Sequence, residues 1–137
     1  MIRTEIVTGR IEPFSSGDDR KEEGAEVTFN GRVRDTENGK KIVALEYERY
    51  EGMAEEELEH LAQETAKKFS IHDLFCRHRI GEIPVGETSL HISIWSEHRE
   101  EGLQALDWFI TELKKRIPIW KWAVFLDGTK KASHHDH

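Results

Sequence analysis

The chain has 137 residues, which is the size of one compact domain, and 36% of them are hydrophobic. This apolar share is enough for a packed core and excludes a disordered chain, although 34% of the residues are charged. The net charge of -7 disfavours non-specific binding of nucleic acid, so any anion site must be local. We expect a single domain over residues 1–137, with a disordered tail over about 129–137.

The apolar runs are far shorter than the about 20 residues that a membrane helix needs, and the N-terminus carries no apolar signal segment. These features predict a cytoplasmic protein that does not act at a membrane. Cys76 is the only cysteine, which excludes an internal disulfide and a multi-cysteine metal centre.

The first half of the chain reads mainly as strands. Runs of β-branched and alternating apolar residues predict strands at residues 2–7, 25–34 and 42–50. The Asn38-Gly39 pair lies between the second and third of these strands and is typical of a tight turn. We therefore expect these two strands to form a hairpin with a mobile loop at 35–41.

Apolar residues at spacings of three and four predict two principal amphipathic helices, at residues 53–69 and 100–116. Pro118 ends the second helix. Further strands are predicted at residues 74–83, 88–96 and 119–126, the first two as another hairpin. This order of elements predicts an α+β fold with a mainly antiparallel sheet.

The sequence has no glycine-rich phosphate loop, no nucleophile elbow and no paired metal-ligand motif, so its clearest chemical signal is cationic. Three basic pairs lie at the ends of predicted elements: Lys114 with Lys121, Arg32 with Arg34, and His98 with Arg99. The two arginines alternate with Val33 and so share one strand face. His98 and Arg99 lie at the start of a predicted helix, where free backbone N–H groups favour the binding of an anion. Together these pairs predict a focused anion pocket.

Each of these residues also has an ordinary interpretation. Taken alone, Lys114 and Lys121 read as surface lysines, the two strand arginines as solvent-facing, and His98 as a helix-start residue. Cys76 lies in a strand-like run, so we expect a buried small apolar residue and do not assign it as a sulfur carrier.

Five segments occur in one order between about residues 24 and 121, and together they resemble the large, catalytic subunits of molybdopterin synthases. The segments are residues 24–34 (GAEVTFNGRVR), 45–53 (LEYERYEGM), 78–82 (HRIGE), 97–99 (EHR) and 113–121 (LKKRIPIWK). Each segment alone is weak, whereas the combination is highly specific.

The resemblance implies an α/β-hammerhead fold and a sulfurtransferase activity in molybdenum cofactor biosynthesis. In that family, two dithiolene sulfurs are inserted into cyclic pyranopterin monophosphate. The sulfur arrives as a thiocarboxylate on the C-terminal Gly-Gly tail of a small ubiquitin-like subunit. Two large subunits form a central homodimer, and one small subunit at each end completes a heterotetramer. The resemblance implies no metal and no cofactor for this step.

Carried over position by position, the resemblance implies catalytic roles for Lys114 and Lys121. It implies substrate binding by four further residues: Arg32, Arg34, His98 and Arg99. The last two would contact the phosphate from across the dimer. These roles agree with the chemistry, because a lysine ammonium stabilises developing negative charge and an arginine fork binds a phosphate.

A second class of function stays open, namely a non-catalytic module that binds a phosphorylated metabolite or an acidic peptide tail. Trp122 and Ala123 follow Lys121, where family members commonly carry a basic and then an acidic residue. An assay of dithiolene formation with a thiocarboxylated small subunit distinguishes the two classes.

Overall fold

The computed structural model describes residues 1–13 and 19–133. In chain order the elements are β1 (Ile2–Val7), β2 (Ala25–Arg32), β3 (Thr36–Glu37), β4 (Lys40–Lys41), β5 (Ala44–Arg49), α1 (Met53–Lys68), β6 (Ile71–Arg79), β7 (Gly81–Pro84), β8 (Thr88–Ser96), α2 (Arg99–Arg116), β9 (Ile119–Val124) and β10 (Lys130–Ser133). The predicted α+β class, with two helices and mostly antiparallel strands, is confirmed.

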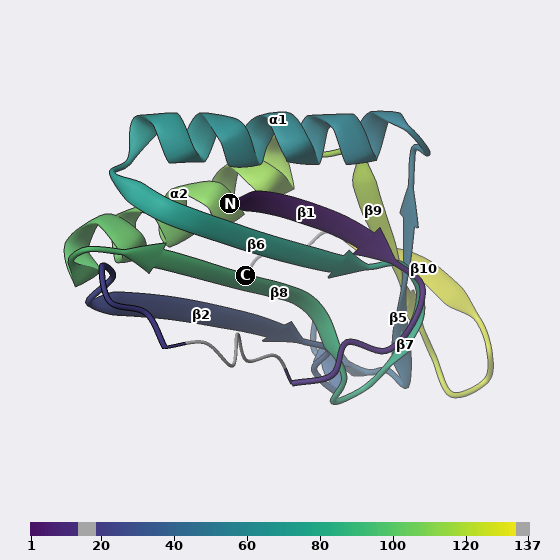
Figure 1. Cartoon of the computed structure of the whole chain (residues 1–137). Helices are drawn as coiled ribbons and strands as arrows, with labels where there is room; N and C mark the ends of the chain where they lie inside the picture. The colour runs from purple at the N-terminus through teal and green to yellow at the C-terminus, as the bar shows by residue number, and fades with distance from the viewer. Residues whose placement is uncertain (14–18, 134–137) are drawn as a thin grey trace.

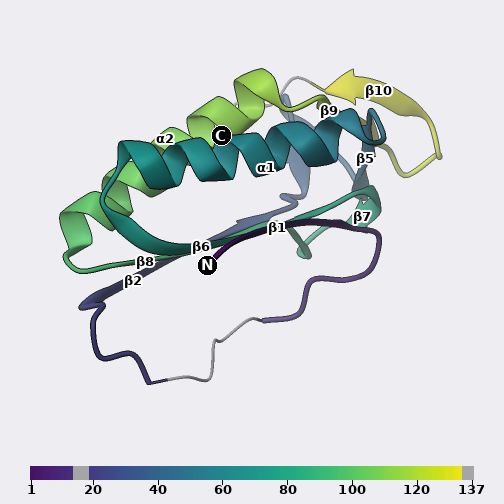
Figure 2. The ribbon, with the colours of Figure 1, turned by 45° about the horizontal axis from the view of Figure 1, so that its top comes forward.

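The sheet with the longer strands carries both helices on one face. Its strand order is β1-β6-β8-β2, with β1 parallel to β6 and the other neighbours antiparallel. The helices α1 and α2 cover one face, whereas residues 8–13 and 19–24, between β1 and β2, lie on the side of the opposite face (Figure 1, Figure 2). Every residue of the central strand β8 is buried, as expected for a strand covered on both faces.

The main core lies between the helices and this sheet. Leu58 and Leu61 of α1 and Phe109 of α2 are completely buried there, together with Leu74 and Ile92 of the sheet. The predicted spacing of three and four residues places the helical members on one inward face. Full burial of each such side chain contributes about 2 kcal/mol, so this face fixes both helices on the sheet.

The second sheet runs across one end of the first (Figure 1). Its order is β10-β9-β5-β7, and all its neighbours are antiparallel. Its inward side chains, such as Leu45, Tyr47, Ile83 and Ala123, form a second core cluster. Because Pro118 ends α2 immediately before β9, the last turn of α2 lies close to this second sheet.

The predicted hairpin between strands 25–34 and 42–50 is wrong. Strand β2 pairs with β8, and β5 pairs with β9 and β7 in the other sheet. The Asn38-Gly39 signal makes a much smaller hairpin, β3 with β4, in which both residues adopt positive φ (51° and 80°). A turn signal fixes only local geometry, whereas the pairing of β2 is decided by burial against the central strand.

The second predicted hairpin is right in its pairing, because β6 and β8 are antiparallel neighbours. The connection differs, since Gly81 with φ 90° lets the chain leave the first sheet so that β7 joins β5.

The expectation of a disordered tail is wrong for Lys130–Ser133, which forms β10 against β9. The strand is stabilised by its ladder and by the ion pair between Lys130 and Glu46. Residues 134–137 lie outside the described part of the chain. Within the described part, no helix is long and apolar enough to cross a membrane.

Candidate active site

Lys114 and Lys121 line one pocket at the junction of the two sheets. Lys114 lies in the last turn of α2, and Lys121 lies in the middle of β9, beyond the break at Pro118. The remaining wall is largely apolar and includes Phe29, Leu90, Leu113, Ile117 and Ile119. Two cations in a partly apolar pocket act on an anion more strongly than they would in bulk water.

Lys121 is only 4% exposed, so its interpretation as an ordinary surface lysine is wrong. It points to the inward side of the second sheet, where its register partners are Tyr47 on β5 and Ser133 on β10. Its Nζ lies 3.4 Å from Oε2 of Glu37 on β3. Lys114 is half-buried, because the end of α2 leaves part of its side chain open to solvent.

Glu37 is the anionic residue next to the pocket, and its side chain is 9% exposed. Ser133 Oγ donates a hydrogen bond to its Oε2, and Arg34 Nη2 lies 4.0 Å from its Oε1. Burial opposes ionisation of this carboxyl. The hydrogen bond from Ser133 and the positive charge of Lys121 outweigh the burial and hold the pKa of Glu37 below its ordinary value.

Tyr47 and His78 form an aromatic part of the pocket wall. Their rings meet edge to face, with centroids 5.3 Å apart. The Nδ1 atom of His78 donates to the carbonyl oxygen of Arg79 at 2.8 Å, which fixes the ring. Burial raises the pKa of Tyr47, against a hydrogen bond from Ser89, so its hydroxyl stays protonated at neutral pH.

Arg32 and Arg34 are exposed and flank the buried Val33, as the predicted alternation requires. Neither arginine lines the pocket. Arg32 donates from Nη1 to the carbonyl oxygen of Gly86 at 3.2 Å. Arg34 is close to the site only through Glu37, and 69% of its side chain is exposed. Both guanidinium groups are therefore accessible to an anion from solvent.

His98 and Arg99 lie at the start of α2, as predicted, and both are exposed. Lys114 lies fifteen residues further along the same helix, which is about 22 Å at 1.5 Å per residue. One chain therefore does not bring this basic pair to the pocket that holds Lys114 and Lys121.

Cys76 lies in β6 and is fully buried in the main core, which confirms the sequence interpretation. Burial strongly raises the pKa of its thiol, so the nucleophilic thiolate is disfavoured.

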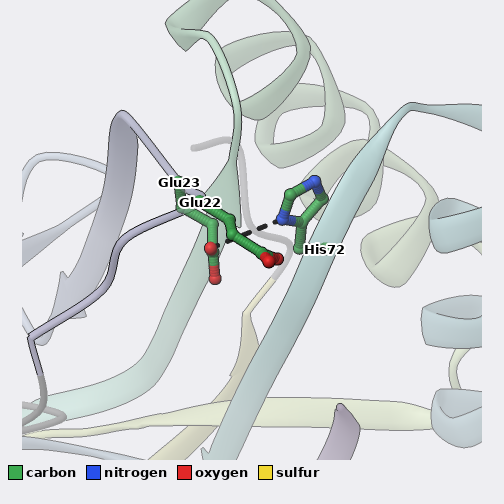
Figure 3. Close-up of side chains that lie close together, drawn as sticks. All are labelled: Glu22, Glu23 and His72. Carbon is green, nitrogen blue, oxygen red and sulfur yellow. Dashed lines mark ion pairs between the residues drawn. The ribbon is translucent and has the colours of Figure 1, made fainter.

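A separate group of ligand-type side chains, Glu22, Glu23 and His72, lies near the start of β6 (Figure 3). Their nearest ligand atoms are within 4.8 Å of one another. Arg20 Nη1 donates to Glu23 at 2.7 Å and to Asp73 at 2.6 Å, so the Glu23 carboxylate already has a cationic partner from the chain itself. We interpret the group as an ion-pair network that attaches the segment before β2 to β6. It is about 20 Å along β6 from the pocket residue His78.

Sequence reasoning did not assign site roles to Glu37, Ser133, Tyr47 or His78. The alternation of Leu45 and Tyr47 with glutamates could have placed Tyr47 on an inward face. No local signal identifies Glu37 or Ser133, because their contacts to β9 join distant parts of the chain.

Comparison with known proteins now decides the family. The family model described as MoaE protein matches residues 4–116. The chain belongs to the MoaE family. The site positions on β9 and β10, together with Ile117, lie beyond the matched range, and the other site positions fall within it.

A MoaE-family relative from Pyrococcus abyssi, named molybdopterin synthase catalytic subunit, is 41% identical over 105 residues, which cover 77% of this chain and 71% of the relative. The crystal structure of molybdopterin synthase from Staphylococcus aureus superimposes with a TM-score of 0.85 at 31% identity, covering 95% of this chain and 96% of that one. A complex of subunits 1 and 2 of molybdopterin-converting factor from Helicobacter pylori contains a chain with a TM-score of 0.71 at 22% identity, covering 98% and 90%. At 22% identity, the likeness to the Helicobacter pylori chain shows a shared fold.

Proposed function

We propose that this MoaE-family chain is the catalytic subunit of a molybdopterin synthase, a sulfurtransferase in molybdenum cofactor biosynthesis. The observation that carries the proposal is the joint placement of Lys114 and Lys121 in one pocket. The names of relatives up to 42% identical support the same activity. A cytoplasmic location, expected from the sequence, remains part of the proposal.

The proposed substrate is cyclic pyranopterin monophosphate, and the proposed sulfur donor is the C-terminal thiocarboxylate of a small ubiquitin-like subunit. A Gly-Gly tail has no side chains, so it suits a narrow pocket with walls such as Leu113 and Ile117. When the thiocarboxylate sulfur has bonded to the substrate, water attacks the acyl carbon, the acyl–sulfur bond breaks, and the tail leaves as a carboxylate while the sulfur stays on the substrate. This attack places negative charge on the acyl oxygen. Lys114 and Lys121 stabilise this charge, and a lysine among other cations can also transfer a proton.

The exposed Arg32 and Arg34 are proposed to bind the anionic substrate at the pocket entrance. His98 and Arg99 are proposed to bind its phosphate from a second large subunit, because they lie at the far end of α2 in their own chain. The active assembly is then a homodimer of large subunits with a small subunit at each end. The Helicobacter pylori complex of two different subunits supports a partner of this kind.

The deciding experiment is a single-turnover assay of dithiolene formation with the thiocarboxylated small subunit and the pterin substrate. Wild type should form product, and Lys121→Ala should lose most of the rate. Lys115→Ala is the matched control, because Lys115 is adjacent to Lys114 on α2 but 69% of its side chain is exposed. Binding of both partners by wild type without product would instead show a non-catalytic binding module.

A further inference from the structure

Glu37 contacts the pocket lysine from outside the pocket. Lys121 lines the pocket, whereas Glu37 lines a separate small cavity with Ala123 and Ser133. The Lys121 ammonium thus has the pocket on one side and the Glu37 carboxylate, at 3.4 Å, on another. Glu37 therefore does not line the pocket, but it contacts a residue that does.

Three different elements hold this contact. Glu37 comes from β3, Lys121 from β9 and Ser133 from β10. Ser133 is the register partner of Lys121 in the ladder, and its hydroxyl donates to Oε2, the same carboxylate oxygen that faces the ammonium. The hydrogen bond therefore fixes the orientation of the carboxylate toward Lys121.

A buried lysine needs such a partner. Removing an ammonium group from water is unfavourable unless an anion or hydrogen-bond acceptors replace the water. A lysine side chain also has four rotatable bonds, so an unanchored ammonium group would occupy several positions. A fixed carboxylate favours the charged form of the lysine and also holds its ammonium group in one position.

We propose that Glu37 is a positioning residue, whose carboxylate keeps the Lys121 ammonium charged and directed at the pocket during sulfur transfer. The kinetic consequences of this inference rest on the proposed function. The effect of Glu37 on the charge state of Lys121 does not depend on that function and can be measured on the isolated chain. The two consequences are tested separately.

Glu46 supplies a matched control. Its carboxylate on β5 pairs with Lys130 of β10 at 2.9 Å, so Glu46→Gln also removes an ion pair within the second sheet. Glu46 does not line the pocket and its ion pair does not involve Lys121. Any effect confined to Glu37→Gln therefore comes from the contacts of Glu37 with Lys121, Ser133 and Arg34, and not from the general loss of an ion pair in the second sheet.

The kinetic test compares wild type, Glu37→Gln and Glu46→Gln in the single-turnover assay over a range of pH. Glu37→Gln should lower kcat by about tenfold with little change in KM, because an error in the position of one charged group acts on the transition state. The alkaline limb of its pH profile should move to lower pH, since the lysine loses the anion that favours its charged form. An unchanged profile, or an equal effect of Glu46→Gln, overturns the positioning role. An inactive wild type counts against the proposed function alone.

The second test needs no activity. The side-chain ε-CH2 signal of Lys121, assigned by its loss in Lys121→Arg, is followed by NMR during an alkaline titration. Its midpoint should lie at lower pH in Glu37→Gln than in wild type, and Glu46→Gln should leave it unchanged. The same midpoint in all three proteins overturns the inference, whatever the kinetic result.

Discussion

Lys114 and Lys121 line the same pocket although the proline break after α2 lies between them. In the proposed function both ammonium groups act on one region of developing charge, so their contributions should not be independent. We expect each single alanine variant to lose about a hundredfold in rate, which corresponds to roughly 3 kcal/mol. The double variant should lose clearly less than the product of the two single losses.

Single-turnover rates of the four proteins, wild type and the three variants, measure this coupling. Circular dichroism and thermal melting confirm that each variant is folded. Losses that multiply in full would show that the two lysines act at separate steps or separate sites.

Local patterns predicted the parts of the fold and site that depend on neighbouring residues. The spacing of apolar residues predicted both helices, and Pro118 predicted where α2 ends, so Lys114 and Lys121 were placed close together. The placement of Arg32 and Arg34 on either side of a buried residue also followed from strand periodicity.

Local patterns could not predict what long-range packing decides. The partner of β2 is β8, 56 to 71 residues further along the chain, and the Asn38-Gly39 turn signal pointed to a nearer strand. Glu37 reaches Lys121 only because that small hairpin lies against β9 and β10. A single glutamate in a polar loop carries no mark of such a contact, so the anionic part of the site became visible only in three dimensions.

The ionisation of Glu37 should contribute to stability in a defined pH range. Its pKa is held below the ordinary value of 4.5 by Ser133 and Lys121 in spite of burial. A carboxyl with a lowered pKa in the folded state stabilises the protein above its unfolded pKa, and this contribution is lost as the pH falls through the folded pKa. At neutral pH we expect Glu37→Gln to lower the free energy of unfolding by about 2 kcal/mol.

Urea unfolding of wild type and Glu37→Gln, from neutral pH to well below 4.5, tests this expectation. The difference between the two proteins should shrink as the pH falls from 4.5 through the lower pKa of folded Glu37, because below that pKa wild type also carries a neutral side chain at this position. Other carboxyl groups are common to both proteins and cancel in the difference. A difference that stays constant through the acid range would contradict the role of ionised Glu37.

Cys76 should be chemically inert in the folded protein, because it is fully buried and its thiol pKa is raised by burial. A thiol reagent should modify the native chain very slowly and the denatured chain rapidly. Since the sequence has one cysteine, the labelling stoichiometry is unambiguous. Cys76→Ala should keep a sulfur-transfer rate close to wild type. Fast labelling of the native chain together with loss of transfer would reassign this residue to the chemistry.

The distance of about 22 Å along α2 between Arg99 and Lys114 leads to a prediction about assembly. If Arg99 serves the pocket of the neighbouring protomer, a Lys121→Ala chain and an Arg99→Ala chain are complementary. In their heterodimer, the pocket of the Lys121→Ala chain carries both lesions, whereas the pocket of the Arg99→Ala chain carries neither. Mixing two weakly active proteins should therefore restore activity.

With equal amounts and random exchange, half of the dimers are heterodimers and each has one intact pocket, so about a quarter of the wild-type activity should return. The control is a mixture of Lys121→Ala with Lys114→Ala. Each lesion lies in the pocket of the chain that carries it, so each pocket of the heterodimer lacks one lysine and neither is intact. Subunit exchange is verified by mass spectrometry of differently tagged chains, and sedimentation gives the oligomeric state. A monomer at micromolar concentration, or exchange without recovery of activity, would show that each chain builds its phosphate site from its own residues.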